Sequence, residues 1–121
     1  MVNSKKKGSR GEREFANLCR EEGYDGARRS QQYCGANNDA DVVGLPGIHI
    51  EVKRVQALNI GKAIAQSIRD AKTSEIPIVA HRKDREKWLI TMLAEDWFRV
   101  YREFEAGFDL DQRGVGVGGT S

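Results

Sequence analysis

The 121-residue sequence contains only two cysteines, Cys19 and Cys34, and no histidine and cysteine cluster with the spacing of a zinc site. It also lacks any apolar segment approaching the ~18 residues that a membrane-spanning helix needs. The N-terminus is basic, but no apolar region follows it, so we expect no secretory signal. These absences exclude a disulfide-stabilised scaffold and favour a reduced, cytoplasmic protein that does not enter a membrane.

A strong net charge is absent as well. Twenty lysines and arginines against 18 acidic residues leave a formal charge of +2, so no global basic field indicates a nucleic-acid partner. The basic residues are instead clustered at positions 5–13, 28–29 and 82–87. Such patches suit contact with a phosphate backbone, although a sequence that is 31% charged produces exposed clusters in any case.

Hydrophobic periodicity predicts a single domain, residues 9–106, between a flexible basic arm (1–8) and a flexible glycine-rich tail (107–121). Helices are expected at 9–22, 59–72 and 94–106, a hairpin within 38–53, and further strands at 24–30, 76–81 and 88–92. The fold class is therefore α/β, with a mixed central sheet flanked by helices. The aromatic residues of the last helix belong either to the core or to a dimer surface.

The hairpin carries the candidate chemistry. Side chains alternate along a strand, so Glu51 and Lys53 share one face while the apolar residues around them point to the other. The preceding strand begins at Asp41, which brings a second carboxylate into the same neighbourhood. Two carboxylates a few ångströms apart repel each other, and a hard divalent cation with oxygen ligands relieves that repulsion. The alternative is an edge strand with an exposed Glu51–Lys53 pair, which would be nearly neutral energetically.

Asp41, nine intervening residues and then Glu51-Val52-Lys53 resemble the signature of the PD-(D/E)XK nucleases. With Gly11-Glu12-Arg13-Glu14 on the first helix, about two-thirds of the chain resembles the Holliday junction resolvases of archaea and phages. Ala40 stands where the family often has proline, which leaves Asp39 as an alternative to Asp41. We favour Asp41, because Val42 and Val43 follow it directly, as buried strand residues should.

The resemblance implies a restriction-endonuclease-like core and hydrolysis of DNA phosphodiester bonds with Mg²⁺ or Mn²⁺. Asp41 and Glu51 would hold the metal together with the Val52 carbonyl, and Lys53 would orient the attacking water. Glu12 would complete the metal environment or bind a second ion. From the residues alone, Glu12 can instead close a capping box that starts at Ser9.

The resemblance also places Ser30 and Gln66 in the site, although Gln66 can equally be a surface residue. It implies a four-way junction or other branched DNA as substrate, in a bacterial or phage-infected cell. Two strands must be cut, so a homodimer is expected. The basic residues expected to contact DNA are Lys5, Lys6, Lys7, Arg10, Arg13, Arg28, Arg29, Arg54, Lys62, Arg82 and Lys83. Two alternatives stay open: a phage-type replication and repair nuclease for flaps, nicks or duplexes, and a non-catalytic branched-DNA-binding protein on the same fold.

Overall fold

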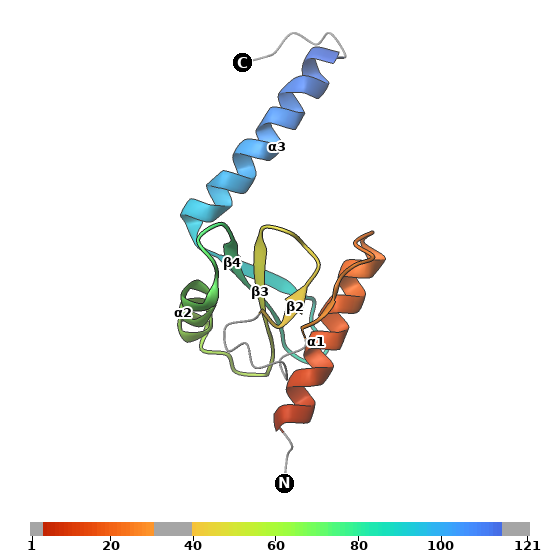
Figure 1. Ribbon diagram of the computed structural model, residues 1–121, viewed down its shortest axis with the longest axis vertical. Helices are drawn as coiled ribbons and strands as arrows, with labels where there is room; N and C mark the ends of the chain where they lie inside the picture. The colour runs from red at the N-terminus through yellow and green to blue at the C-terminus, as the bar shows by residue number, and fades with distance from the viewer. Residues whose placement is uncertain (1–3, 31–39, 115–121) are drawn as a thin grey trace.

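The computed structural model describes residues 4–30 and 40–114, and within them the side chains of residues 8–30 and 40–108 (Figure 1). Its centre is a five-stranded sheet in the order β1-β2-β3-β4-β5. Strands β3 and β4 run parallel, and every other neighbouring pair is antiparallel. The predicted mixed sheet flanked by helices is therefore confirmed. The strands span Arg28–Arg29 (β1), Val42–Val43 (β2), Ile48–Arg54 (β3), Ile76–Arg82 (β4) and Leu89–Met92 (β5).

Helix α1 (Ser4–Glu21) covers one face of the sheet. Its apolar stripe contributes Phe15, Ala16 and Cys19 to the core, where they meet buried residues of three strands, namely Val42, Ile50, Val52, Ile78 and Ala80. Gly11 lies where the helix crosses β3. A Cβ atom built at Gly11 would lie 2.9 Å from the Cβ atom of Arg54, so the absence of a side chain lets the helix approach the strand closely.

Helix α2 (Ile60–Asp70) packs on β3 and β4 from the other side of the sheet (Figure 1). It begins after Asn59, whose side chain accepts a hydrogen bond from the Lys62 backbone N–H at 3.1 Å. Small residues make its contact: Ala63 is buried, and the Ser67 hydroxyl donates to the Ile78 carbonyl at 2.9 Å. The sequence predicts a buried stripe at helical spacing along this helix, from Ile60 to Ala71. That prediction is wrong in part, because Ile60 and Ile68 are exposed. Because the residues at the contact are small, α2 lies close to the sheet, and its larger side chains remain outside the contact.

The start of α1 and the start of β1 both differ from the sequence prediction. Helix α1 starts at Ser4, since the segment contains neither proline nor a β-branched run that would stop a helix. Ser9 is thus inside the helix, and its hydroxyl accepts a hydrogen bond from Arg29 Nη2 at 2.9 Å, so the predicted capping box is wrong. Strand β1 is shorter than predicted, because residues 24–26 form a turn in which the Ala27 N–H donates to the Tyr24 carbonyl. Residues 1–3 and 115–121 of the predicted arm and tail lie outside the described residues.

Helix α3 (Ala94–Gly114) runs well past the predicted end at 106 and extends away from the sheet (Figure 1). Its large apolar side chains remain between 41% and 63% exposed. Of the two alternatives for the aromatic residues of this helix, a place in the core is therefore wrong. Helices α1 and α2 already cover the two faces of the central strands, so α3 has no central surface left to cover. None of the described helices is long and apolar enough to cross a membrane.

Candidate active site

The hairpin of β2 and β3 fixes Asp41 against the backbone of β3. Val42 pairs with Ile50 in the antiparallel register, and the Asp41 N–H donates to the Ile50 carbonyl at 2.9 Å. The Asp41 side chain turns back to the same strand, where its Oδ2 atom accepts a hydrogen bond from the Val52 N–H at 2.9 Å. These two hydrogen bonds, one from the Asp41 backbone and one to its side chain, therefore hold the Asp41 carboxylate beside Glu51 and Val52.

Glu51 lies at the centre of the sheet and not at its margin. Strand β3 has a neighbour on each side, and the Glu51 side chain is only 2% exposed. The alternative of an exposed ion pair on an edge strand is therefore wrong. A carboxylate this deeply buried is costly unless polar partners or a cation compensate for the lost water.

The two carboxylates interact strongly enough to change the protonation of Asp41. Burial raises the pKa of Asp41 from its ordinary value of 3.8 to about 7, and the charge of Glu51 adds to this increase. The charge of Glu12 acts in the same direction, while the hydrogen bond from the Val52 N–H opposes it. Near neutral pH the Asp41 carboxyl group is therefore only partly ionised, and a bound cation would favour its ionised form.

His49 is a site residue that the sequence prediction did not identify. It is 2% exposed, and its Nε2 atom lies 2.7 Å from Oε2 of Glu51, while Nδ1 lies 3.7 Å from Oε1 of Glu75. Burial lowers the pKa of His49, but the hydrogen bond to Glu51 and the charges of Glu51, Glu75 and Asp70 together raise it above the ordinary value of 6.5. The available signal was its position two residues before Glu51 on the same strand face.

Glu12 and Ser30 border this centre from two other elements. Glu12, on α1, forms an ion pair with Arg29 Nε at 3.1 Å, and its charge still acts on Asp41. The Ser30 backbone N–H donates to the Asp41 carbonyl at 3.0 Å, which places Ser30 directly beside the aspartate. Both sequence-predicted residues therefore come to the neighbourhood of Asp41. Asp39, the alternative metal ligand, lies outside the described residues.

The donor set suits a hard divalent cation with few protein ligands. Within the described part of the chain, no group of three or more histidine, cysteine, aspartate or glutamate side chains is arranged to hold a metal ion. Mg²⁺ keeps several of its waters and is commonly bound by one or two carboxylates, so Asp41 and Glu51 fit that ion.

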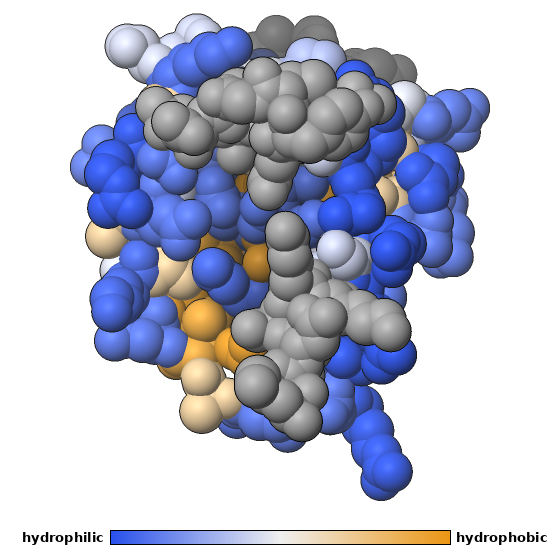
Figure 2. All heavy atoms as spheres, turned by 60° about the horizontal axis from the view of Figure 1, so that its bottom comes forward, coloured by the Kyte–Doolittle hydropathy of each residue, from blue (hydrophilic) through white to orange (hydrophobic). Residues whose placement is uncertain are grey.

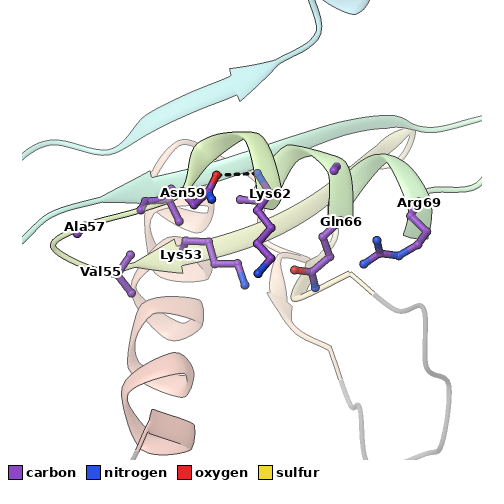
Figure 3. A pocket seen from close by; sticks show the side chains of 10 residues that line it. Lys53, Val55, Ala57, Asn59, Lys62, Gln66 and Arg69 are labelled. Carbon is purple, nitrogen blue, oxygen red and sulfur yellow. Dashed lines mark hydrogen bonds between the residues drawn. The ribbon is translucent and has the colours of Figure 1, made fainter.

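A basic cleft of about 450 Å³ lies between the end of β3 and α2, and Lys53, two residues after Glu51, is part of its lining. Lys53 enters it from the strand, and Lys62, Gln66 and Arg69 enter it from α2 with their side chains directed to the same side (Figure 3). The described lining contains three cationic side chains and no carboxylate. On the side of the molecule in Figure 2, the described surface is mostly hydrophilic and the apolar area is limited. The cleft therefore suits an anionic ligand such as a phosphate group.

Three of the arginines predicted to bind DNA, Arg29, Arg54 and Arg82, form ion pairs with carboxylates of α1. Arg54 contacts Glu14 at 3.2 Å and Asp84 at 3.1 Å. Arg82 contacts the same Glu14 at 3.0 Å and lies 5.8 Å from the centroid of a Trp88 ring. Arg29 is held by the ion pair described above. These contacts give the three arginines a role in packing α1 against the sheet. The other described basic residues predicted to bind DNA are exposed, namely Arg10, Arg13, Arg28, Lys62 and Lys83. The side chains of Lys5, Lys6 and Lys7 lie outside the described set.

No model of a known protein family matches the chain. A comparison with curated proteins also finds no significant match.

Proposed function

We propose that this chain is a metal-dependent DNA nuclease of the PD-(D/E)XK type that hydrolyses phosphodiester bonds in branched DNA. The observation that carries the proposal is the electrostatic coupling of the half-buried Asp41 to the buried Glu51, with Lys53 next on the same face of β3. His49 compensates part of the cost of burying Glu51, and the Val52 N–H holds Asp41, but neither contact removes the repulsion between the two carboxylates, which a bound cation would.

The proposed metal is Mg²⁺ or Mn²⁺, held by Asp41 and Glu51, with the Val52 carbonyl as a further oxygen ligand. When bound, such an ion lowers the pKa of a coordinated water and acts as a Lewis acid toward the phosphate. Its charge would also offset the repulsion that raises the pKa of Asp41. Glu12 lies close enough to add a further negative charge, although it is paired with Arg29.

The residues of the chain would perform the remaining tasks. Lys53 donates hydrogen bonds from Nζ, so it would orient the attacking water and stabilise the negative charge that develops on the phosphate. Lys62 and Arg69, from the opposite wall of the cleft, would bind the neighbouring phosphates. Gln66 lies between them and would donate from its amide group. His49 would hold the Glu51 carboxylate in one orientation.

Branched DNA is proposed over plain duplex because of the small size of the charged area. The chain has a formal charge of only +2, and five arginines among the described residues form ion pairs with carboxylates. A protein with few free cations binds a uniform duplex weakly, since non-specific affinity grows with the number of neutralised phosphates. A junction offers a higher local density of phosphates and a distinct shape, which suits a small charged cleft.

The test compares cleavage of a labelled four-way junction with cleavage of a linear duplex of the same sequence, in Mg²⁺ or in EDTA. The variant is Glu51→Gln, and the matched control is Glu22→Gln, which makes the same change at an exposed residue after α1. The proposal expects paired cuts in the junction that disappear with EDTA and with Glu51→Gln but persist in Glu22→Gln. Cuts in flaps, nicks or duplex would keep the nuclease and assign the repair substrate instead. Junction binding without cutting in Mg²⁺ or in Mn²⁺ would overturn the proposed nuclease activity and leave a DNA-binding protein.

A further inference from the structure

Helix α3 presents an apolar face that none of the described residues of the chain covers. Six large apolar side chains of the helix are between 41% and 63% exposed, namely Trp97, Phe98, Val100, Tyr101, Phe104 and Phe108. Soluble monomers rarely expose a continuous apolar surface of this kind, and such a surface usually marks an interaction site.

The aromatic rings on this face contact one another. Ring centroids lie 5.5 Å apart for Trp97 and Tyr101, 5.8 Å for Tyr101 and Phe104, and 6.3 Å for Phe104 and Phe108. The row continues onto the sheet margin, where Ile90, Thr91 and Met92 of β5 form a groove of about 520 Å³ with Ala94, Trp97 and Phe98. Ile90 in this groove is 50% exposed.

The spacing of the row is that of a helix that packs against another helix. Ala94, Trp97, Tyr101, Phe104 and Phe108 are separated by alternating steps of three and four residues, which is the pattern of a coiled-coil seam. Phe98 and Val100 flank this seam and widen it. A helical partner with the same pattern would fill the face, and a second copy of the chain supplies such a helix.

Charge excludes the two other common partners of an exposed amphipathic helix. Between residues 94 and 108 there are four acidic residues (Glu95, Asp96, Glu103, Glu105) and two arginines (Arg99, Arg102), so this segment carries a net charge of −2. DNA requires lysines and arginines at its contact surface. Helices that bind anionic membranes likewise carry lysine and arginine on their polar face. An uncharged or apolar protein surface is the occupant that remains.

The exposed area is close to what a stable dimer needs. Large apolar and aromatic side chains bury roughly 150–250 Å² when fully covered, so about half of that, ~100 Å², is available at each of these residues. Seven such residues, the six of α3 and Ile90, give ~700 Å² for each chain and ~1,400 Å² for a pair, which lies within the range of specific interfaces. The estimate favours a complete interface between two copies.

The geometry points to α3 as a self-association surface, through which two copies of this chain pack their aromatic faces together about a two-fold axis. A two-fold contact uses the same surface on both copies and closes on itself, so it leaves no exposed apolar face at the end. The inference does not depend on the nuclease proposal. If both hold, one particle carries two Asp41–Glu51 centres.

Sedimentation equilibrium of the full chain tests this surface over micromolar concentrations. The expected mass is twice the 13.6 kDa of one chain. Phe104→Lys places a charge in the seam and should weaken self-association by about 30-fold or more, as expected for the loss of a central aromatic contact. Ala106→Lys is the matched control, since it introduces the same charge on the opposite side of the helix and should leave the dimer unchanged.

Phe104→Leu completes the series, because it keeps an apolar residue in the seam and should give an intermediate dissociation constant in a folded protein. A wild-type chain that is monomeric at every concentration would overturn the inference, as would a Phe104→Lys variant as dimeric as Ala106→Lys. Binding of a monomeric wild-type chain to phosphatidylcholine vesicles would assign the face to lipid and would overturn it too.

Discussion

The Nε2 atom of His49 lies 2.7 Å from the Oε2 atom of Glu51, and both side chains are only 2% exposed. A buried carboxylate keeps a fixed orientation when a hydrogen-bond donor holds one of its oxygens. On the far side of the imidazole, Nδ1 faces Glu75 at 3.7 Å. His49 therefore acts as a positioning residue for the carboxylate that the proposed function assigns to the metal.

His49→Ala should weaken Mn²⁺ binding by roughly 10- to 100-fold, as the loss of an outer partner of a metal ligand commonly does. Isothermal titration calorimetry of the purified chain measures this constant directly and does not require cleavage. Glu75→Gln is the control: it removes the charge near Nδ1 of the same imidazole, keeps an oxygen that can accept from the Lys72 N–H, and should change the dissociation constant little. Equal affinities for wild type and His49→Ala would show that His49 does not support the metal ligand.

Asp41 should make the metal-free protein less stable as the pH rises through 7. Its pKa in the folded state is raised to about 7 by burial and by the charges of Glu51 and Glu12, against an ordinary value of 3.8. Between these two values the folded protein retains a proton that the unfolded chain has released. The stabilising contribution is therefore complete below 3.8 and is lost as the pH rises through the folded-state value.

Asp41→Asn cannot ionise, so it should retain the free energy of unfolding that wild type loses. We expect the variant to be more stable than wild type by about 1–3 kcal/mol above pH 7 in EDTA, and the difference to shrink under acidic conditions. Urea unfolding at several pH values measures the difference, with the exposed Asp25→Asn as a control for the loss of a surface charge. Parallel pH profiles for wild type and Asp41→Asn would contradict the assignment of the raised pKa. Added Mg²⁺ should stabilise wild type above pH 7 and leave Asp41→Asn nearly unchanged.

Lys53→Ala and Lys62→Ala separate the two tasks of the basic cleft. Lys53 shares the face of β3 with Glu51, whereas Lys62 enters the cleft from α2 (Figure 3). Lys53→Ala should reduce kcat by about 10²- to 10³-fold with little change in DNA binding, since a donor aimed at developing charge acts mainly in the transition state. Lys62→Ala should instead raise KM and reduce the salt dependence of binding, with kcat nearly unchanged. Single-turnover cleavage and filter binding provide both quantities, and wild-type rates in Lys53→Ala would reject the site.

The hairpin was predictable because the interactions that define it are local. The turn at Pro46 and Gly47, the alternation along β3 and the short span between Asp41 and Glu51 are all visible in the sequence. His49 was missed because two residues on one strand face can either contact each other or diverge, depending on their rotamers. The contacts of Glu14 with Arg54 and Arg82 join residues that are distant along the chain, and no local pattern indicates them.

The two ends of the fold were less predictable for a related reason. The sequence from Ser9 to Glu12 satisfies the pattern of a capping box. Both side chains contact Arg29 instead, which lies 20 residues after Ser9 and 17 residues after Glu12. Helix α3 shows a clear apolar face in the sequence, which reveals that the face needs a partner but not which surface provides it. A long-range contact decides the first case. The second is decided by the fact that no surface within residues 4–30 and 40–114 covers the apolar face of α3.

Gly11 and Gly8, both in α1, offer a test of how closely this helix must approach β3. A Cβ atom at Gly11 would lie 2.9 Å from the Arg54 Cβ and 3.6 Å from Val52 Cγ1, whereas nothing lies within 4 Å of a Cβ at Gly8. The Arg54 Cβ belongs to the strand and cannot rotate away, so either the helix or the strand must shift. Glu12, the next residue of the helix, would move with it relative to Asp41.

Gly11→Ala should therefore lower the free energy of unfolding by about 1–2 kcal/mol, because the cost of overpacking exceeds the gain in helix propensity. Gly8→Ala makes the same chemical change at an open position and should raise the free energy of unfolding by up to about 1 kcal/mol. Guanidinium unfolding of both variants beside wild type provides the comparison. An equal gain in both would mean that α1 tolerates a methyl group at its crossing with β3. The close approach would then not be what sets the distance between Glu12 and Asp41. Opposite signs would show that Gly11 is required for this packing, because propensity alone predicts the same sign at both positions.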